Sequence, residues 1–275
     1  MRAKRTIGWL AALALVAAAI ALVYYWVQKA APPAGPPEVQ SLPPPAPEVL
    51  SAPPVSSEPK ILYPIIEERP PEQPPLPTLR ESDGALRQAL AALTGGKSLA
   101  EIGLFSDLVR RVVATVDNLP RQKVAQRLLP VTNVEGLILV SRDVEGAVLM
   151  PQNSARYAGH MRVVEAVDTK QLVALYVRFY PLFQQAYRDL GYPKGYFNDR
   201  LVEVIDHLLA APEVQGPLRL VQPKVMYKFA DPELEALSAG QKILIRMGSA
   251  NASRLKAKLR DIRRELINQT ANRPS

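Results

Sequence analysis

One short stretch, residues 195–213, carries the side chains of the chain that are best suited to acid–base or metal chemistry. Within its residues 199–207 it contains Asp199, Glu203, Asp206 and His207. At 100° per residue, all four fall on one face of a helix, and Glu203 and His207 have the i, i+4 spacing at which two groups can share a proton or a metal ion. The stretch therefore offers candidate catalytic residues.

The same pattern also fits the exposed face of an ordinary amphipathic helix. The opposite arc is apolar, and acids near a helix N-terminus interact favourably with the helix dipole without any further role. The two histidines, His160 and His207, are far apart in sequence, and the chain has no cysteine. It also lacks the H-E-x-x-H, G-x-S-x-G, P-loop and dinucleotide motifs. The sequence predicts no metal and no cofactor, while paired carboxylates acting on a glycan would leave no local motif.

Aromatic residues gather directly before this stretch. Eight Tyr and Phe residues lie between Tyr176 and Phe197, and the helical spacing of several of them favours core packing. The alternative is a platform for sugar rings or a partner peptide, with cations interleaved beside it. On that interpretation the candidate ligand-binding residues are Arg156, Tyr157, Tyr180, Tyr192, Tyr196 and Arg200.

Positive charge is concentrated near the end of the chain. Residues 240–275 contain nine Lys and Arg against two acids, in a chain whose net charge is +8. One interpretation is a solvated helix face, with cations favourably placed near the helix C-terminus. The other is a contact for a polyanion such as anionic lipid, wall carboxylates or an acidic partner. Its candidate residues are Arg246, Lys256, Arg260 and Arg264.

The elements that position these residues occupy only part of the chain. Residues 7–27 lack any charge and would span about 32 Å as a helix, enough to cross a bilayer. A cleaved signal peptide is the alternative. Because residues 1–6 are basic, the positive-inside rule predicts a cytoplasmic N-terminus and a periplasmic remainder. Residues 28–77 contain most of the 27 prolines and predict a disordered, extended linker, whose "PPLP" could also dock a partner.

Residues 78–275 have the ordinary composition of one globular domain with a basic C-terminal helix. Apolar periodicity and capping residues predict helices over 83–93, from Ser98 to Leu119, between Pro120 and Pro130, from Asp168 to Leu190, from an Asn198 cap to before Pro212, at Asp231–Pro232, and from Ser238 to Leu266. Short strands are expected within "VEGLILVSRDVEGAVLM", "LRLV" and "KVMYKF". The expected fold class is mainly α, of the α+β type, with a minor antiparallel sheet.

Three long phrases carry a resemblance to a known family. They are "VRRVVATVDNLPRQKVAQRLLPV", "LVALYVRFYPLFQQAYRDLGYPKGYFNDRLVEVIDHLLAAPE" and "VQPKVMYKFADPELEALSAGQKILIRMG". The chain resembles a bacterial family of single-pass membrane proteins known as domain of unknown function 3014, over about residues 79–266. The resemblance implies that this range is one unit. It implies no activity, cofactor or catalytic residue.

These features predict an inner-membrane-anchored periplasmic protein that binds or scaffolds in the cell envelope. The alternative is a carboxylate-dependent enzyme acting on cell-wall glycan. The expected partners are the inner membrane, through residues 7–27, and peptidoglycan, anionic lipid or an envelope protein. Nucleic acid is not expected, because the predicted topology places the basic helix outside the cytoplasm.

Overall fold

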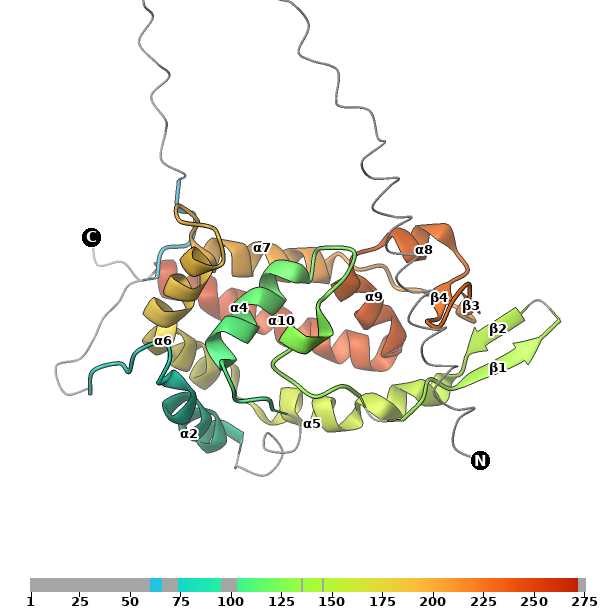
Figure 1. The fold of residues 1–275 in the computed structure, drawn as a ribbon, viewed down its shortest axis with the longest axis horizontal. Helices are drawn as coiled ribbons and strands as arrows, with labels where there is room; N and C mark the ends of the chain where they lie inside the picture. Colours follow the sequence, from blue (N-terminus) through green and yellow to red (C-terminus); the bar gives the residue numbers. More distant parts are fainter. Residues whose placement is uncertain (1–59, 66–73, 95–102, 135, 145, 272–275) are drawn as a thin grey trace, which may run out of the picture. The chain divides into compact units, whose positions relative to one another are not determined.

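The computed structural model describes residues 60–65, 74–94, 103–134, 136–144 and 146–271, and Figure 1 labels their elements. The helices are α2 (Ser82–Thr94), α4 (Leu108–Asn118), α5 (Ala158–Ala166), α6 (Thr169–Asp189), α7 (Phe197–Leu209), α8 (Pro232–Ala236), α9 (Ala239–Arg246) and α10 (Ser249–Ala271). The 3-10 helices are η1 (Gln126–Leu128) and η2 (Pro151–Tyr157). The strands are β1 (Val140–Asp143), β2 (Gly146–Leu149), β3 (Arg219–Val221) and β4 (Lys228–Phe229). The expected mainly helical α+β class is confirmed.

The main core lies among the long helices. Both α6 and α7 pack against α4 and against α10. Their shared interior is aromatic: Phe197 is 1% exposed, stacks on Phe183 with 5.9 Å between ring centroids, and lies 5.5 Å from Tyr187. Because such rings bury large areas, the aromatic repeat of α6 is the packing face of this helix.

The four strands form one antiparallel sheet in the order β1-β2-β3-β4. The predicted hairpin pairs Val140 with Leu149, and the later strands pair Leu220 with Phe229. Leu220 and Phe229 pack against Ile245 of α9 in a hydrophobic cluster of their own. The sheet is thereby attached to the α9 end of the helical core.

The second predicted helix starts later than its sequence pattern indicates. Gly103 pairs with Val131 in an isolated bridge, and α4 begins only at Leu108, after Asp107 adopts a left-handed conformation with φ 53°. Asp83 of α2 accepts hydrogen bonds from the Asp107 and Leu108 amides. A carboxylate from another helix therefore satisfies the first turn of α4. The predicted cap residues Ser98 and Glu101 lie outside the described residues.

Two further predictions of helix ends need correction. The predicted capping box of Ser238 and Gln241 is confirmed, but the helix that it starts ends at Arg246, and α10 begins after Gly248, whose φ is +85°. A left-handed residue cannot continue a right-handed helix, so the expected single helix is two. Asn198 is not a cap, because α7 begins at Phe197 and Asn198 is wholly buried in its first turn.

The N-terminal boundary of the packed region also differs from the expectation. Residues 60–65, assigned to the linker, are hydrogen-bonded to the start of α7, and Ile65 is 8% exposed within the main core. The predicted membrane helix, residues 7–27, lies outside the described residues. Within the described ranges, no helix is both long and apolar enough to cross a bilayer.

Candidate functional site

The polar face of α7 holds the candidate acids, and its first member fixes a neighbouring chain segment. The carboxylate of Asp199 accepts hydrogen bonds from the main-chain N–H groups of Leu62, at 2.9 Å, and Tyr63, at 2.7 Å. The adjacent Asn198 donates from Nδ2 to the Tyr63 carbonyl at 2.9 Å. Asp199 and Asn198 thus bind residues 60–65 through their backbone.

The last two polar residues of α7 face other helices. Asp206 forms a bidentate ion pair with Arg263 of α10, and this pair raises the pKa of Arg263. His207 Nε2 lies 2.8 Å from Ser238 Oγ, the group that caps α9. Both side chains join α7 to its neighbours and are occupied by these contacts.

Glu203 is the most exposed of the candidate acids on α7 whose ion pairs the structure describes. Its side chain is 67% exposed and pairs with Arg200 at 3.0 Å. Arg200 in turn contacts Asp117 of α4 at 3.3 Å. Burial lowers the pKa of Arg200, but hydrogen bonding to Glu203 and the charges of Glu203 and Asp117 raise it more, so its net pKa is raised. A cation held in this way neutralises Glu203.

Asp117, which the sequence did not mark as a candidate, is the centre of this polar network. It is 3% exposed and pairs with Arg121 as well as Arg200, while the Tyr192 hydroxyl donates to it at 3.1 Å. The available signal was its position one turn after Val113, on the buried face of α4. A buried carboxylate with three such partners stabilises the junction of α4, α6 and α7.

The other candidate aromatic residues also have internal partners. Tyr180 is 2% exposed, donates to Gln184 at 2.8 Å, and has its pKa raised, chiefly by burial. Tyr196 accepts a hydrogen bond from the Ile65 amide at 2.6 Å. Tyr157 is half-buried, packs against the main core through its ring, and has its pKa raised by burial. None of these hydroxyls stands on an open aromatic platform.

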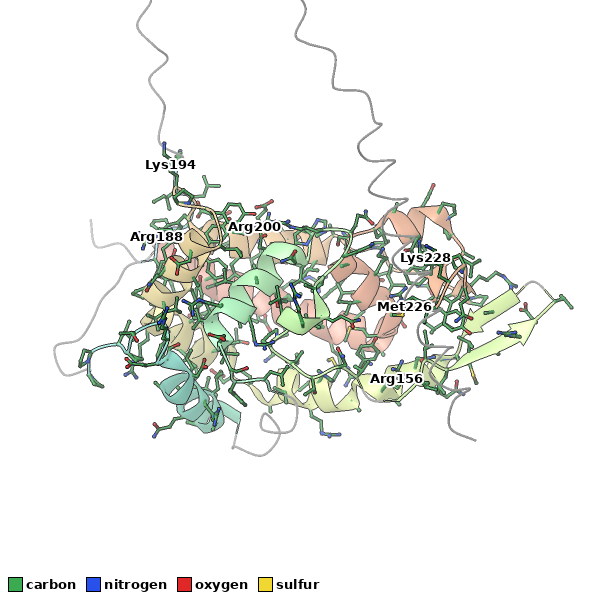
Figure 2. All side chains as sticks on the ribbon, in the orientation of Figure 1. Arg156, Arg188, Lys194, Arg200, Met226 and Lys228 are labelled. Carbon is green, nitrogen blue, oxygen red and sulfur yellow. The ribbon has the colours of Figure 1, made fainter. Side chains whose placement is uncertain are left out.

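The structure does not bring Arg156 together with the residues around α7. Figure 2 shows Arg156 near the β1–β2 hairpin and Arg200 on the far side of the helical core. Arg156 donates to the Gly136 carbonyl at 2.7 Å. The two arginines therefore serve different parts of the domain. Among the described residues, no three acids or histidines gather in a way that could hold a metal ion.

The four candidate cations near the C-terminus separate into two pairs. Arg260 and Arg264 are exposed, and Arg264 pairs with Asp261. Arg246 lies over the Phe229 ring, 4.9 Å from its centroid, whereas Lys256 is 5% exposed and donates to the Ala211 carbonyl at 2.5 Å. The second pair faces inward, toward a cavity.

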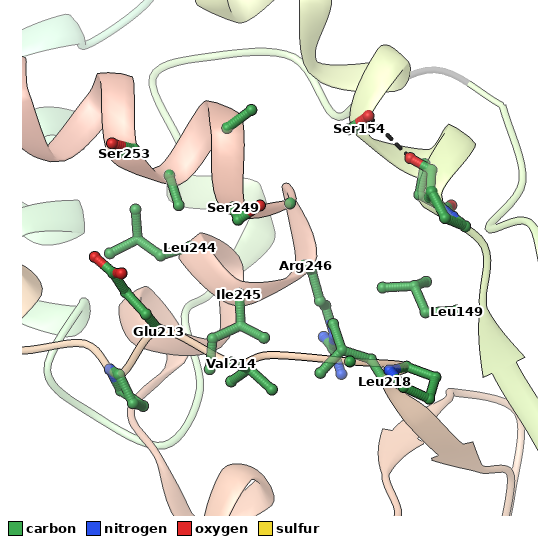
Figure 3. A pocket seen from close by; sticks show the side chains of 18 of the residues that line it. Leu149, Ser154, Glu213, Val214, Leu218, Leu244, Ile245, Arg246, Ser249 and Ser253 are labelled. Atoms are coloured by element: carbon green, nitrogen blue, oxygen red, sulfur yellow. Dashed lines mark hydrogen bonds between the residues drawn. The ribbon is translucent and has the colours of Figure 1, made fainter.

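This cavity, which we call the sheet–helix cavity, has a volume of about 710 Å³. Three segments enclose it: β2 together with η2, the loop of residues 212–218, and the junction between α9 and α10 (Figure 3). Apolar side chains such as Leu149, Val214 and Ile245 form much of its wall, and both Arg246 and Lys256 line it. Its size falls in the range of about 300–1,000 Å³ that is typical of small-molecule sites.

Two buried asparagines hold the walls of this cavity in place. Asn153 of η2 donates to the Leu139 and Met150 carbonyls and accepts from the Leu139 amide. Asn251 of α10 donates to the Ser154 carbonyl at 3.0 Å. These bonds tie the hairpin to η2 and η2 to α10, so polar groups of the chain itself fix the cavity walls.

The chain matches the family described as "Protein of unknown function (DUF3014)" over residues 108–263. It belongs to that family. Searches of curated proteins and of solved structures found no match. The matched range contains every residue that lines the sheet–helix cavity, so this cavity lies wholly within the DUF3014 region.

Sequence reasoning missed the cavity of this DUF3014 domain because its walls come from distant segments. One local signal was present in the sequence, the glycine at position 248. In the structure Gly248 follows α9 with a positive φ, and a Cβ at this position would come within 3.2 Å of the Ser154 side chain. Ser249, Ser253 and Lys256 follow at the i, i+4, i+7 spacing of one helix face. That face of α10 is the one turned toward the cavity.

Proposed function

We propose that this DUF3014 protein is an inner-membrane-anchored binding protein of the bacterial periplasm, and that its sheet–helix cavity holds a small ligand. The uncharged segment 7–27 with its basic flank supports the anchoring, and the Pro-rich residues before 60 support a tether. The scaffold then carries the cavity at some distance from the bilayer.

The observation that carries this proposal is the cavity with cations in its wall. Catalysis by the α7 carboxylates is less well supported, because a general acid or base must reach its substrate in a cleft. Asp199 and Asp206 are bound by main-chain amides and by Arg263, and Glu203 is paired at the open surface. Binding therefore accounts for the geometry better than glycan hydrolysis.

A cavity-filling variant tests this function directly. Ser253 is exposed and lines the cavity, so Ser253→Phe places a ring in it without disturbing the core. Ala257, exposed one turn further along α10, lies outside the lining and gives the matched control Ala257→Phe. Three extracts of the cell envelope are tested: its lipids, its muropeptides and its soluble small molecules. We expect at least one of them to raise the melting temperature of wild type and of Ala257→Phe, but not of Ser253→Phe.

Equal stabilisation of all three proteins would contradict the cavity as the binding site. The anchoring is tested separately by fusing a reporter enzyme that is active only in the periplasm to Ser275. We expect activity in intact cells and co-sedimentation of the fusion with the membrane fraction. An inactive reporter would place the domain on the other side of the membrane.

A further inference from the structure

We propose that the ligand of the sheet–helix cavity is a small amphiphile, in which one carboxylate or phosphate group is joined to an apolar body. This inference rests on the proposed function and adds the chemistry of the ligand. It combines two properties of the cavity wall, its excess of positive charge and its apolar lining.

The charge of the wall favours an anion. Lys256 and Arg246 line the cavity, and Glu213 is the one acid among the lining residues. Glu213 is exposed at the edge and forms no ion pair with either cation in the part of the chain that the structure describes. A buried cation without an acidic partner carries a desolvation cost that an anionic ligand group would offset.

Lys256 is the strongest single feature of this site. Its side chain lies in a residue that is only 5% exposed, and within the described ranges its ammonium makes one hydrogen bond, to the Ala211 carbonyl beyond the end of α7. That bond uses one of the three N–H donors of the ammonium group. The positive charge of the group also interacts favourably with the negative end of the α7 dipole. The remaining donors belong to a group that lines the cavity and can bind an anion there.

Arg246 and the start of α10 add further donors. The Arg246 Nε atom is buried and has no hydrogen-bond partner among the residues that the structure describes, although its Nη2 atom donates to the Tyr227 carbonyl at 3.2 Å. In Figure 3 its side chain extends from the end of α9 toward Leu218. Ser249 opens α10, a helix of 23 residues, so the positive end of its dipole lies at the same cavity. All these donors favour carboxylate or phosphate.

Most of the remaining wall is apolar, and it favours a ligand whose anionic group is joined to an apolar body. Leu149, Pro151, Val214, Leu218, Leu244 and Ile245 contribute side chains without a hydrogen-bonding group. An apolar body gains about 25 cal/mol for each Å² that such a wall removes from water. Glu213, Ser249 and Ser253 are exposed, so the cavity opens to solvent and admits a small molecule.

Four probes that share an eight-carbon chain test this ligand class: octanoate, octyl phosphate, octanol and octylammonium. The full-length chain in nanodiscs of zwitterionic lipid is titrated with each probe by calorimetry, with empty nanodiscs as the blank. We expect octanoate and octyl phosphate to bind at least about tenfold more tightly than octanol, and octylammonium to bind most weakly, since a charge-assisted hydrogen bond contributes that much.

Matched variants assign this preference to the cavity. Lys256→Met should reduce the affinity for octanoate about tenfold and leave that for octanol unchanged. Arg260→Met, which removes an exposed cation of the same helix, should change neither. If Lys256→Met does not fold, wild type still tests the proposal, because added salt should weaken octanoate binding and not octanol binding.

The outcomes separate this inference from the proposed function. Equal binding of all four probes, abolished by Ser253→Phe, would overturn the anionic ligand class and leave the cavity as a binding site. Binding of anionic vesicles with no binding of the soluble probes would also overturn it, since the partner would then be a membrane surface. If no probe binds, this ligand class fails, and the envelope-extract experiment decides separately on the cavity.

Discussion

The polar face of α7 and the sheet–helix cavity differ in how their charges are compensated. On α7, Asp199 accepts two main-chain amides and Asp206 pairs with Arg263, so the acids are matched by groups of the same domain. In the cavity, Arg246 and Lys256 face apolar walls, with Glu213 only at the exposed edge. Acids that are matched by groups of the same domain stabilise the fold, whereas cations that line a cavity without an acidic partner remain able to bind an anionic ligand.

The largest effect that tests this comparison is expected at Asp117. Replacing the buried Asp117 by Asn leaves the largely buried Arg200 and the half-exposed Arg121 beside a neutral group. We expect a loss of about 3 kcal/mol in the free energy of unfolding, measured by urea titration. The control Asp261→Asn, which breaks an exposed pair with Arg264, should cost less than about 1 kcal/mol. Equal costs would contradict the structural role of Asp117.

A smaller effect is expected at Asp199, because its carboxylate is only partly buried. Asp199→Ala removes the acceptor of the Leu62 and Tyr63 amides and should cost about 2 kcal/mol. Hydrogen exchange of these two amides should accelerate, while octanoate binding stays unchanged. The exposed Glu203→Ala should cost less than about 0.5 kcal/mol. Unchanged exchange at Leu62 and Tyr63 would show that Asp199 does not hold this segment.

The buried tyrosines predict a loss of stability in alkali. Burial is the largest cause that raises the pKa of Tyr180, so its phenol stays protonated in the folded chain. The unfolded chain ionises near pH 10, so this contribution is complete below pH 10 and decreases as the pH rises above it. Between pH 10 and pH 11, wild type should lose about 1 kcal/mol more than Tyr180→Phe in urea titrations, because the unfolded phenol is already half ionised at pH 10. Parallel losses would contradict the buried state.

Only a small effect on stability is expected in the cavity. Lys256→Met loses the bond to Ala211 but also avoids the desolvation of an ammonium group, so the two terms offset each other. We expect the free energy of unfolding of the ligand-free chain to change by less than about 1 kcal/mol. A loss of 3 kcal/mol or more would make Lys256 a structural residue like Asp117 and remove the contrast between the two regions.

Local patterns were sufficient for most of the secondary structure. The helix from Asp168, the hairpin within residues 134–150 and the capping box at Ser238 were predicted because each depends on neighbours in sequence. Two helix boundaries failed where a distant group intervened. Asp83 of α2 supplies the hydrogen-bond acceptor for the first turn of α4. Gly248 separates α9 from α10 at a point where the Ser154 side chain packs closely against it.

The sequence by itself determined the helical class, the amphipathic face of α7 and the positive charge of the last helix. Only the tertiary structure decided which of these charges are neutralised. Asp206 meets Arg263 across 57 positions, and Lys256 meets the Ala211 carbonyl across 45. Helix periodicity sets the face on which a side chain lies, but burial and charge pairing depend on what packs against that face.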